Sequence, residues 1–161
     1  MHKHLYLFIM LLLLQACANL PEFDTSKVNR QLTPETVSRS PTGAKGQTVF
    51  WSGLILSSKN LKTSTRLEVL AYPVDKDGWP NLDAKPIGRF LADYAGYLET
   101  ADYAKGRLLT VVGPISGIEK GKLDETEYTY PVVQAEQKYL WPKSNRKRGT
   151  SVHFGIGVIF H

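Results

Sequence analysis

Arg107-Leu108-Leu109-Thr110-Val111-Val112-Gly113-Pro114-Ile115 is the stretch that decides the fold of this 161-residue chain. Aliphatic and β-branched residues dominate it, which is the composition of a β-strand. Gly113 lies inside the run, and a glycine within a strand suits the sharp bends and bulges of a small barrel. The stretch therefore predicts a strand, and the fold class follows from how many similar strands flank it.

Similar stretches occur on both sides of this run. Thr48–Leu56 combines β-branched and aromatic residues, and Arg66–Tyr72 has apolar residues mainly at every second position, as a half-buried strand does. Asp75-Lys76-Asp77-Gly78 is a turn signal. Further strands are predicted at residues 88–94, at 128–141 with a bend at Pro131, and at 151–160. Five or six strands with almost no helix predict an all-β fold, a small OB-like β-barrel first and a general β-sandwich second.

The chain begins with an apolar run, Leu5–Leu14. A membrane-spanning helix needs about 20 apolar residues, so this run is too short and instead indicates a secretory signal peptide. It ends in Leu14-Gln15-Ala16-Cys17, which holds the only cysteine. This ending resembles the lipobox of bacterial lipoproteins, where the signal peptidase cuts before a cysteine that becomes acylated. The sequence therefore predicts a lipid anchor at Cys17, and by the same resemblance Ala18 indicates the outer membrane.

Three segments follow from this interpretation. Residues 1–16 are the predicted signal peptide, 17–46 a flexible lipidated tether with a short helix, and 47–161 the β-barrel domain. The helix is expected to start with Thr33 as its cap and Pro34 at its first position. Cleavage leaves 161 − 16 = 145 residues, enough for one domain with an ordinary core.

A family resemblance appears once the strands are placed. Short motifs come in the order and spacing of the Slp family, outer-membrane lipoproteins of Gram-negative bacteria. They are Trp51-Ser52-Gly53, Arg66-Leu67-Glu68-Val69, Tyr72-Pro73-Val74-Asp75, Gly88-Arg89-Phe90, Lys105-Gly106-Arg107, Thr110-Val111-Val112-Gly113, Gly117, Gly121-Lys122, Tyr130-Pro131-Val132-Val133 and Leu140-Trp141. The resemblance implies an outer-membrane location and this type of fold, and it implies no catalytic residues.

The formal charge of +5 bears on partners. A basic chain often binds nucleic acid, but an exported lipoprotein rarely meets it, so anionic lipid head groups are the favoured counter-charge. A basic cluster lies in one predicted loop: Lys143, Arg146, Lys147 and Arg148. It is either a solvated loop or a contact with head groups.

Trp79 lies in a Gly-Trp-Pro loop and is the tryptophan most expected to be exposed. Aromatic side chains on an OB-like barrel can form a stacking surface for sugars or bases. The favoured interpretation is that they fill the barrel and its rim, because aromatic side chains dominate core burial. Trp79 is therefore a candidate ligand-binding residue, with core filling as the alternative.

The sequence contains few residues that indicate catalysis or metal binding. After removal of the leader only His153 and His161 remain, and a metal site needs converging ligands. No nucleophile elbow, zinc-protease motif or phosphate loop occurs. The sequence therefore predicts no catalytic residue, no metal and no cofactor. The apolar face of residues 151–161 indicates a barrel-closing or edge-covering strand, or a sticky edge for oligomers or membrane contact.

Three hypotheses about function result. The first is a non-enzymatic structural or stress-related lipoprotein of the Gram-negative outer membrane, facing the periplasm and bound to lipid through acylated Cys17. The second is a periplasmic glycan- or peptide-binding module with an aromatic face, whose partner the sequence does not name. The third, an enzyme, requires a groove that holds His153 beside Ser or Asp side chains.

Overall fold

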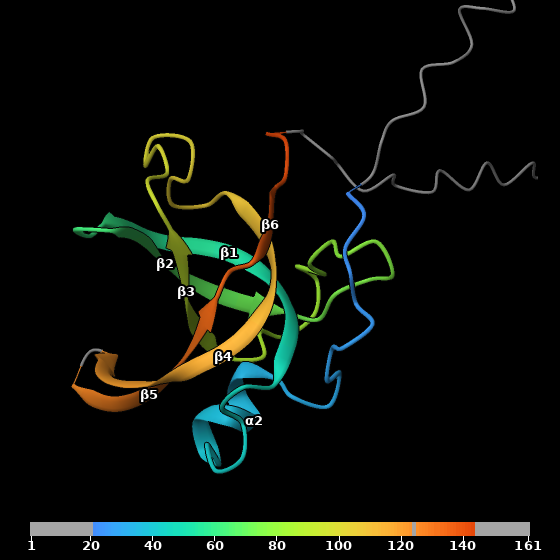
Figure 1. Cartoon of the computed structure of the whole chain (residues 1–161), viewed down its shortest axis with the longest axis vertical. Helices are drawn as coiled ribbons and strands as arrows, with labels where there is room; N and C mark the ends of the chain where they lie inside the picture. The colour runs from blue at the N-terminus through green and yellow to red at the C-terminus, as the bar shows by residue number, and fades with distance from the viewer. Residues whose placement is uncertain (1–20, 124, 144–161) are drawn as a thin grey trace, which may run out of the picture.

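The computed structural model describes residues 21–123 and 125–143 (Figure 1). Within these ranges it contains one short helix and six strands. They are α2 (Pro34–Arg39), β1 (Thr48–Asn60), β2 (Ser64–Tyr72), β3 (Arg89–Ala95), β4 (Leu108–Leu123), β5 (Thr126–Gln134) and β6 (Gln137–Leu140). No helix of the described part is long and apolar enough to cross a bilayer. Cys17 and the predicted strand at 151–160 lie outside the described residues.

Five of the strands form a closed, barrel-like ring, and Figure 1 shows how they curve around it. The order is β1-β2-β3-β5-β4, and β4 pairs back with β1 to close it. All of these pairings are antiparallel except that between β3 and β5, which is parallel. β6 adds to β4 at the edge of the sheet. The prediction of an all-β, OB-like fold is confirmed.

The predicted strand at 128–141 is two strands rather than one. Pro131 lies within β5 and pairs with Ile118 of β4. The strand is interrupted later, at Ala135 and Glu136. The amide of Ala135 donates to the carbonyl of Asp93 on β3, whereas the amide of Glu136 donates to Val112 on β4. The chain therefore leaves β3 at this point and continues as β6 along β4.

The interior of the ring is filled by alternating side chains of its strands. On β2 the burial pattern alternates strictly, as expected for a strand with one face on a core. Trp51 from β1 and Phe90 from β3 meet edge to face inside, with ring centroids 5.1 Å apart. Each such burial is worth about 1.5–3 kcal/mol, so the filled interior holds the ring closed.

Two strand glycines let neighbouring strands approach closely. A Cβ on Gly53 would lie 2.0 Å from the Leu70 carbonyl oxygen, and one on Gly113 would lie 1.8 Å from that of Gln134. No side chain fits at such distances, so only glycine allows the strands to bend around the ring here. Gly113 therefore has the role expected of a glycine within a strand of a small barrel, and Gly53 shares it.

Residues 21–47, here called the strap, pack along the ring. The amide of Asn29 donates to the Thr48 carbonyl at 2.8 Å, and the Trp51 indole Nε1 donates to the Leu32 carbonyl at 2.9 Å. Val37, on α2, is fully buried in the core. The part of the predicted tether that the structure describes is therefore packed on the ring. The domain boundary at residue 46 stays a prediction.

The helix of the strap begins as its sequence predicts. The Thr36 amide donates to the Thr33 hydroxyl oxygen at 3.1 Å, and the Thr33 amide donates to the Thr36 hydroxyl at 2.9 Å. Pro34 occupies the first turn, where its missing N–H costs nothing. This reciprocal cap positions Val37 toward the core.

Candidate membrane-facing site

A tight turn positions Trp79, the predicted ligand-binding residue. The Asp75 carboxylate accepts hydrogen bonds from the amides of Asp77 and Trp79, each at 2.9 Å. Gly78 has a φ of 85°, a conformation that favours glycine. The predicted turn is therefore confirmed, and it sets the direction in which the Trp79 side chain leaves the loop.

Trp79 belongs to a stack of three aromatic rings. It meets Trp141 edge to face at 4.6 Å, and Trp141 meets Tyr139 at 4.7 Å. Trp141 is buried, whereas Trp79 and Tyr139 are half-buried. Aromatic side chains with a polar atom favour boundaries between apolar and wet surroundings, and this stack lies at such a boundary on the outer side of the ring.

A buried hydroxyl pair holds this stack to β4. The Trp141 indole Nε1 donates to the Thr110 hydroxyl oxygen at 2.8 Å, and that hydroxyl donates to the Gly78 carbonyl at 2.8 Å. Thr110 also shares a hydrogen bond of 2.7 Å with the Ser52 hydroxyl. Both hydroxyls are fully buried. Thr110 and Ser52 are not among the predicted site residues, although a polar residue within an apolar strand is a signal that could have found them.

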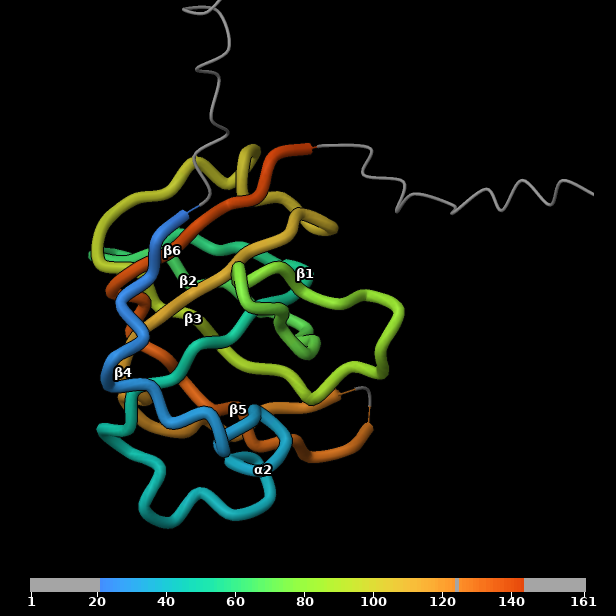
Figure 2. Tube along the Cα trace, turned by 90° about the vertical axis from the view of Figure 1, so that its right-hand side faces the viewer, coloured from blue at the N-terminus to red at the C-terminus, as the bar shows by residue number. Residues whose placement is uncertain are grey.

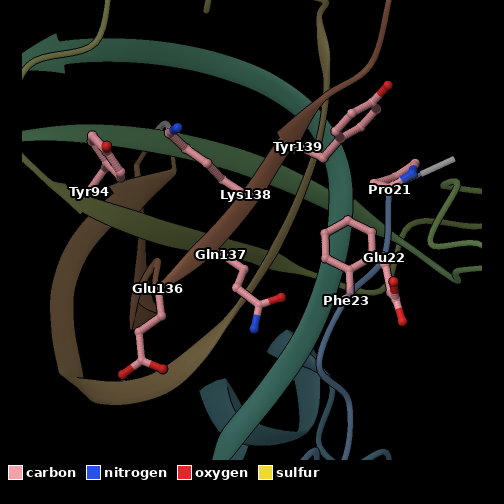
Figure 3. A pocket seen from close by; sticks show the side chains of 8 residues that line it. All are labelled: Pro21, Glu22, Phe23, Tyr94, Glu136, Gln137, Lys138 and Tyr139. Atoms are coloured by element: carbon pink, nitrogen blue, oxygen red, sulfur yellow. The ribbon is translucent and has the colours of Figure 1, made fainter. Parts of the chain in front are cut away.

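Beside the stack runs an open groove of about 430 Å³ between β6 and the start of the strap (Figure 3). Its lining is Pro21, Glu22, Phe23, Tyr94, Glu136, Gln137, Lys138 and Tyr139. Figure 3 shows Phe23 and Tyr139 near Pro21, with Tyr94 and Lys138 at the other end. The Lys138 ammonium lies 4.3 Å from the Tyr94 ring centroid, a cation–π distance. The groove thus combines aromatic surface with mixed charge.

A second polar cluster lies on the outer face of β2, β3 and β4. Arg66 binds both carboxylate oxygens of Asp93, at 2.7 and 2.8 Å, and also contacts Glu119 at 2.6 Å. Its hydrogen bond to Asp93 is the main reason that the pKa of Arg66 is raised above its ordinary value. Arg89 pairs with Glu68 at 2.9 Å. These charges bind one another, so the cluster joins strands.

Tyr130 borders this cluster. Its hydroxyl lies 3.4 Å from the Glu68 carboxylate, and its ring packs edge to face with Tyr128 at 4.7 Å. Burial first, and then the nearby charge of Glu68, raises the pKa of Tyr130. The phenol therefore stays protonated beyond its ordinary range, as suits a neutral donor beside a carboxylate.

The structure describes only some of the predicted site residues. Lys143 is exposed, two residues after Trp141 of the stack. Arg146, Lys147, Arg148, His153, His161 and Cys17 lie outside the described residues. Pro21, at the start of the strap, follows Cys17 by four positions. Within residues 21–123 and 125–143, no group of three His, Cys, Asp or Glu side chains is placed to hold a metal.

The sequence profile of the outer membrane lipoprotein Slp family matches residues 14–157. This chain belongs to the Slp family. Membership makes it a membrane-associated lipoprotein of the outer membrane, and it confirms the family and the location that the sequence motifs predict. The polar clusters and the groove are thus features of a protein whose place is a membrane surface.

Relatives of this Slp-family chain agree with that conclusion. It is 33% identical over 131 residues to the uncharacterized lipoprotein YeaY of Escherichia coli K12, covering 81% of this chain and 67% of the relative. It is 28% identical over 131 residues to the outer membrane protein Slp of the same organism, covering 80% and 69%. An uncharacterized protein of Haemophilus influenzae is 37% identical over 99 residues, covering 61% of this chain. The matched region spans about half, 54%, of that protein's length.

A solved structure shows a weaker likeness to this Slp-family chain. The small single-stranded DNA-binding protein from Streptomyces coelicolor has a TM-score of 0.37 and 12% identity, covering 59% of this chain and 94% of that one. Similarity at this level carries no argument about ligands. It therefore gives no support to nucleic acid as a partner.

Proposed function

We propose that this Slp-family lipoprotein is a non-enzymatic structural or stress-related component of the outer membrane, held on its periplasmic side by acylated Cys17. Leu14-Gln15-Ala16-Cys17 directly after the apolar leader is the observation that carries the proposal. Each buried CH₂ of an acyl chain is worth about 0.8 kcal/mol, and two acyl signals already give stable attachment. The anchor is thus sufficient to keep the folded ring at the membrane.

The packing of the ring supports a structural rather than a catalytic role. Its interior is filled by apolar side chains. In the described part of the chain, every buried side-chain nitrogen or oxygen has a hydrogen-bond partner. The charged side chains of the Arg66 cluster bind one another. These polar groups therefore stabilise the fold.

Cys17→Ala tests the anchor. We expect loss of palmitate labelling and release of the protein from the outer-membrane fraction, because no other thiol can be acylated. The matched control is Ser26→Ala, a conservative change at an exposed strap residue, which should leave both readouts unchanged. Membrane retention of unlabelled Cys17→Ala would refute the anchor.

The basic cluster is proposed to add contact with anionic head groups. Each basic residue near such a surface is worth about 1 kcal/mol. The test variant replaces four residues with Gln: Lys143, Arg146, Lys147 and Arg148. The matched control replaces four exposed lysines elsewhere with Gln: Lys45, Lys85, Lys120 and Lys122. The first variant alone should lose affinity for anionic vesicles at low salt, and equal affinities of the two variants would contradict the contact.

Absence of enzymatic activity is testable with the purified protein. We expect no turnover of generic ester, phosphate, peptide and glycoside substrates above the rate in buffer. The contrary result would be turnover by the wild type that disappears when one polar side chain is replaced, as in Arg66→Met, although the variant still folds. That result would overturn this part of the proposal.

A glycan- or peptide-binding role for Trp79 is the second candidate. It is favoured by the half-buried position of Trp79 at the edge of the aromatic stack. Titration with soluble peptidoglycan fragments should then change the tryptophan fluorescence of the wild type and not of Trp79→Leu. An unchanged wild-type spectrum at saturating concentrations would remove this candidate.

A further inference from the structure

The chain between the proposed anchor and the folded body is short. Pro21 follows Cys17 by four positions, and four fully extended residues span at most about 14 Å. The strap offers little additional slack once it begins. The Phe23 ring packs on Phe50 with centroids 5.2 Å apart, and the Asp24 amide donates to the Gln137 side chain at 3.1 Å.

The connection from Cys17 to Pro21, here called the leash, is short compared with the folded body, residues 21–143, that it holds. A compact domain of about 120 residues has a radius of gyration of about 14 Å, and a uniform sphere with that radius of gyration is about 35 Å across. A leash of about 14 Å is less than half of this diameter. The body therefore cannot turn freely at the membrane, and the end that carries Pro21 must stay near the bilayer.

Pro21 and Lys143 lie at the same end of the molecule. Figures 1 and 2 show both ends of the coloured chain, and the connection between β3 and β4, at the end opposite α2. We propose that this end rests on the phospholipid surface of the outer membrane and that α2 points away from it. This inference rests on the proposed acylation of Cys17, and it adds an orientation to the anchor.

The side chains at this end suit an interfacial position. Tyr97, in the connection between β3 and β4, is 69% exposed, the largest exposed fraction among the large exposed hydrophobic side chains of the described residues. Tyr139 and Phe23 line the groove at Pro21. Tyr is enriched where a protein meets the head-group region, because its ring is apolar and its hydroxyl is polar. Aromatic contact can thus hold the body in the orientation that the leash imposes.

Net charge contributes less to the orientation. The acidic Glu22, directly after Pro21, lies at this end together with the basic Lys143. Opposite charges at one surface offset each other's attraction to anionic lipid, and salt screens what remains. The orientation should therefore persist at high ionic strength.

Energy transfer to labelled lipid tests this orientation in the acylated full-length protein. Once Cys17 is acylated, a newly introduced cysteine is the only reactive thiol, so a donor dye can be attached at one site. The two variants are Ala101→Cys, at an exposed position in the connection between β3 and β4, and Arg39→Cys on α2, where the native side chain is 78% exposed. Both sites are exposed, so the wild-type unfolding transition should be retained. The protein is reconstituted in phosphatidylethanolamine–phosphatidylglycerol vesicles with an acceptor on the head groups.

We expect transfer from position 101 to be several-fold more efficient than from position 39, at both low and high salt. Equal efficiencies would overturn the orientation. A long glycine–serine insertion between Ala18 and Asn19 should reduce the difference, because a flexible linker lets the body turn; an undiminished difference would refute the leash as its cause. Flotation with the vesicles separates the two proposals. Protein that does not float contradicts the anchor, and protein that floats with equal transfer contradicts only the orientation.

Discussion

Gly113→Ala adds a single methyl group at the closest approach between strands. An ideal Cβ at this position lies 1.8 Å from the Gln134 carbonyl oxygen and 3.1 Å from the Glu136 amide nitrogen. Both neighbours are backbone atoms, which cannot rotate away as a side chain would. To reach an ordinary non-bonded distance of about 3.5 Å, the Cβ and the carbonyl oxygen must separate by about 1.7 Å.

Such a separation disrupts the joint between β4 and the chain around Glu136. The hydrogen bond from the Glu136 amide to the Val112 carbonyl, 3.0 Å long, lies directly beside it. Losing a buried backbone hydrogen bond costs about 1–3 kcal/mol, and overpacking costs a further 1–3 kcal/mol or so. We expect Gly113→Ala to lower the free energy of unfolding by about 3 kcal/mol, out of a total of about 5–15 kcal/mol for a typical domain.

Gly117, on the same strand, provides the matched control. A Cβ there meets nothing within 4 Å, and its φ is not positive, so Gly117→Ala should change stability by less than about 1 kcal/mol. Urea unfolding, followed by tryptophan fluorescence, measures both variants. With an m-value of about 1–3 kcal/mol per molar urea, the midpoint of Gly113→Ala should fall by about 1–3 M. Equal midpoints for the two variants would refute the close-approach argument.

Two further substitutions test the polar contacts. Thr110→Val removes the acceptor of the Trp141 indole and should cost about 2 kcal/mol, whereas Thr126→Val at an exposed position should be nearly neutral in the same urea assay; equal losses would contradict the role of the buried hydroxyl. Tyr130→Phe tests the raised pKa of Tyr130. Because folding favours the neutral phenol, its contribution is complete below the unfolded pKa of 10.0 and is lost as pH rises toward the higher folded pKa. The wild type should therefore lose stability above pH 10 more steeply than Tyr130→Phe, and parallel pH profiles would argue against the shift.

Local patterns predicted most of the ring. The alternation in Arg66–Tyr72, the β-branched run around Val111 and the turn at Asp75 each reflect short-range chemistry, and each occurs in the structure as expected. The Thr33 cap was also predicted, because it depends only on residues within one turn. These features can be predicted without knowing which strands pair with one another.

Contacts between distant residues were harder to predict. The strap is polar and contains several prolines, so its composition suggested a free tether, yet a few anchoring contacts such as Trp51 with the Leu32 carbonyl hold it on the ring. The groove was not predicted, because it joins Pro21 to residues more than a hundred positions away on β6. Hydrophobic periodicity does not indicate which residues distant in the sequence come into contact. Cys17 is the opposite case, since its predicted role comes entirely from its immediate neighbours.

The strap also decides how the body would respond to mechanical force. A pull on the lipid would enter the folded chain at Pro21 and load the strap from one end. The Phe23–Phe50 contact would then part before the Asn29–Thr48 hydrogen bond, and that bond before the Trp51–Leu32 bond. Contacts that open one after another resist less than strands sheared all at once. The strap would thus peel away at modest tension and lengthen the connection to the membrane, while the closed ring of strands stays intact.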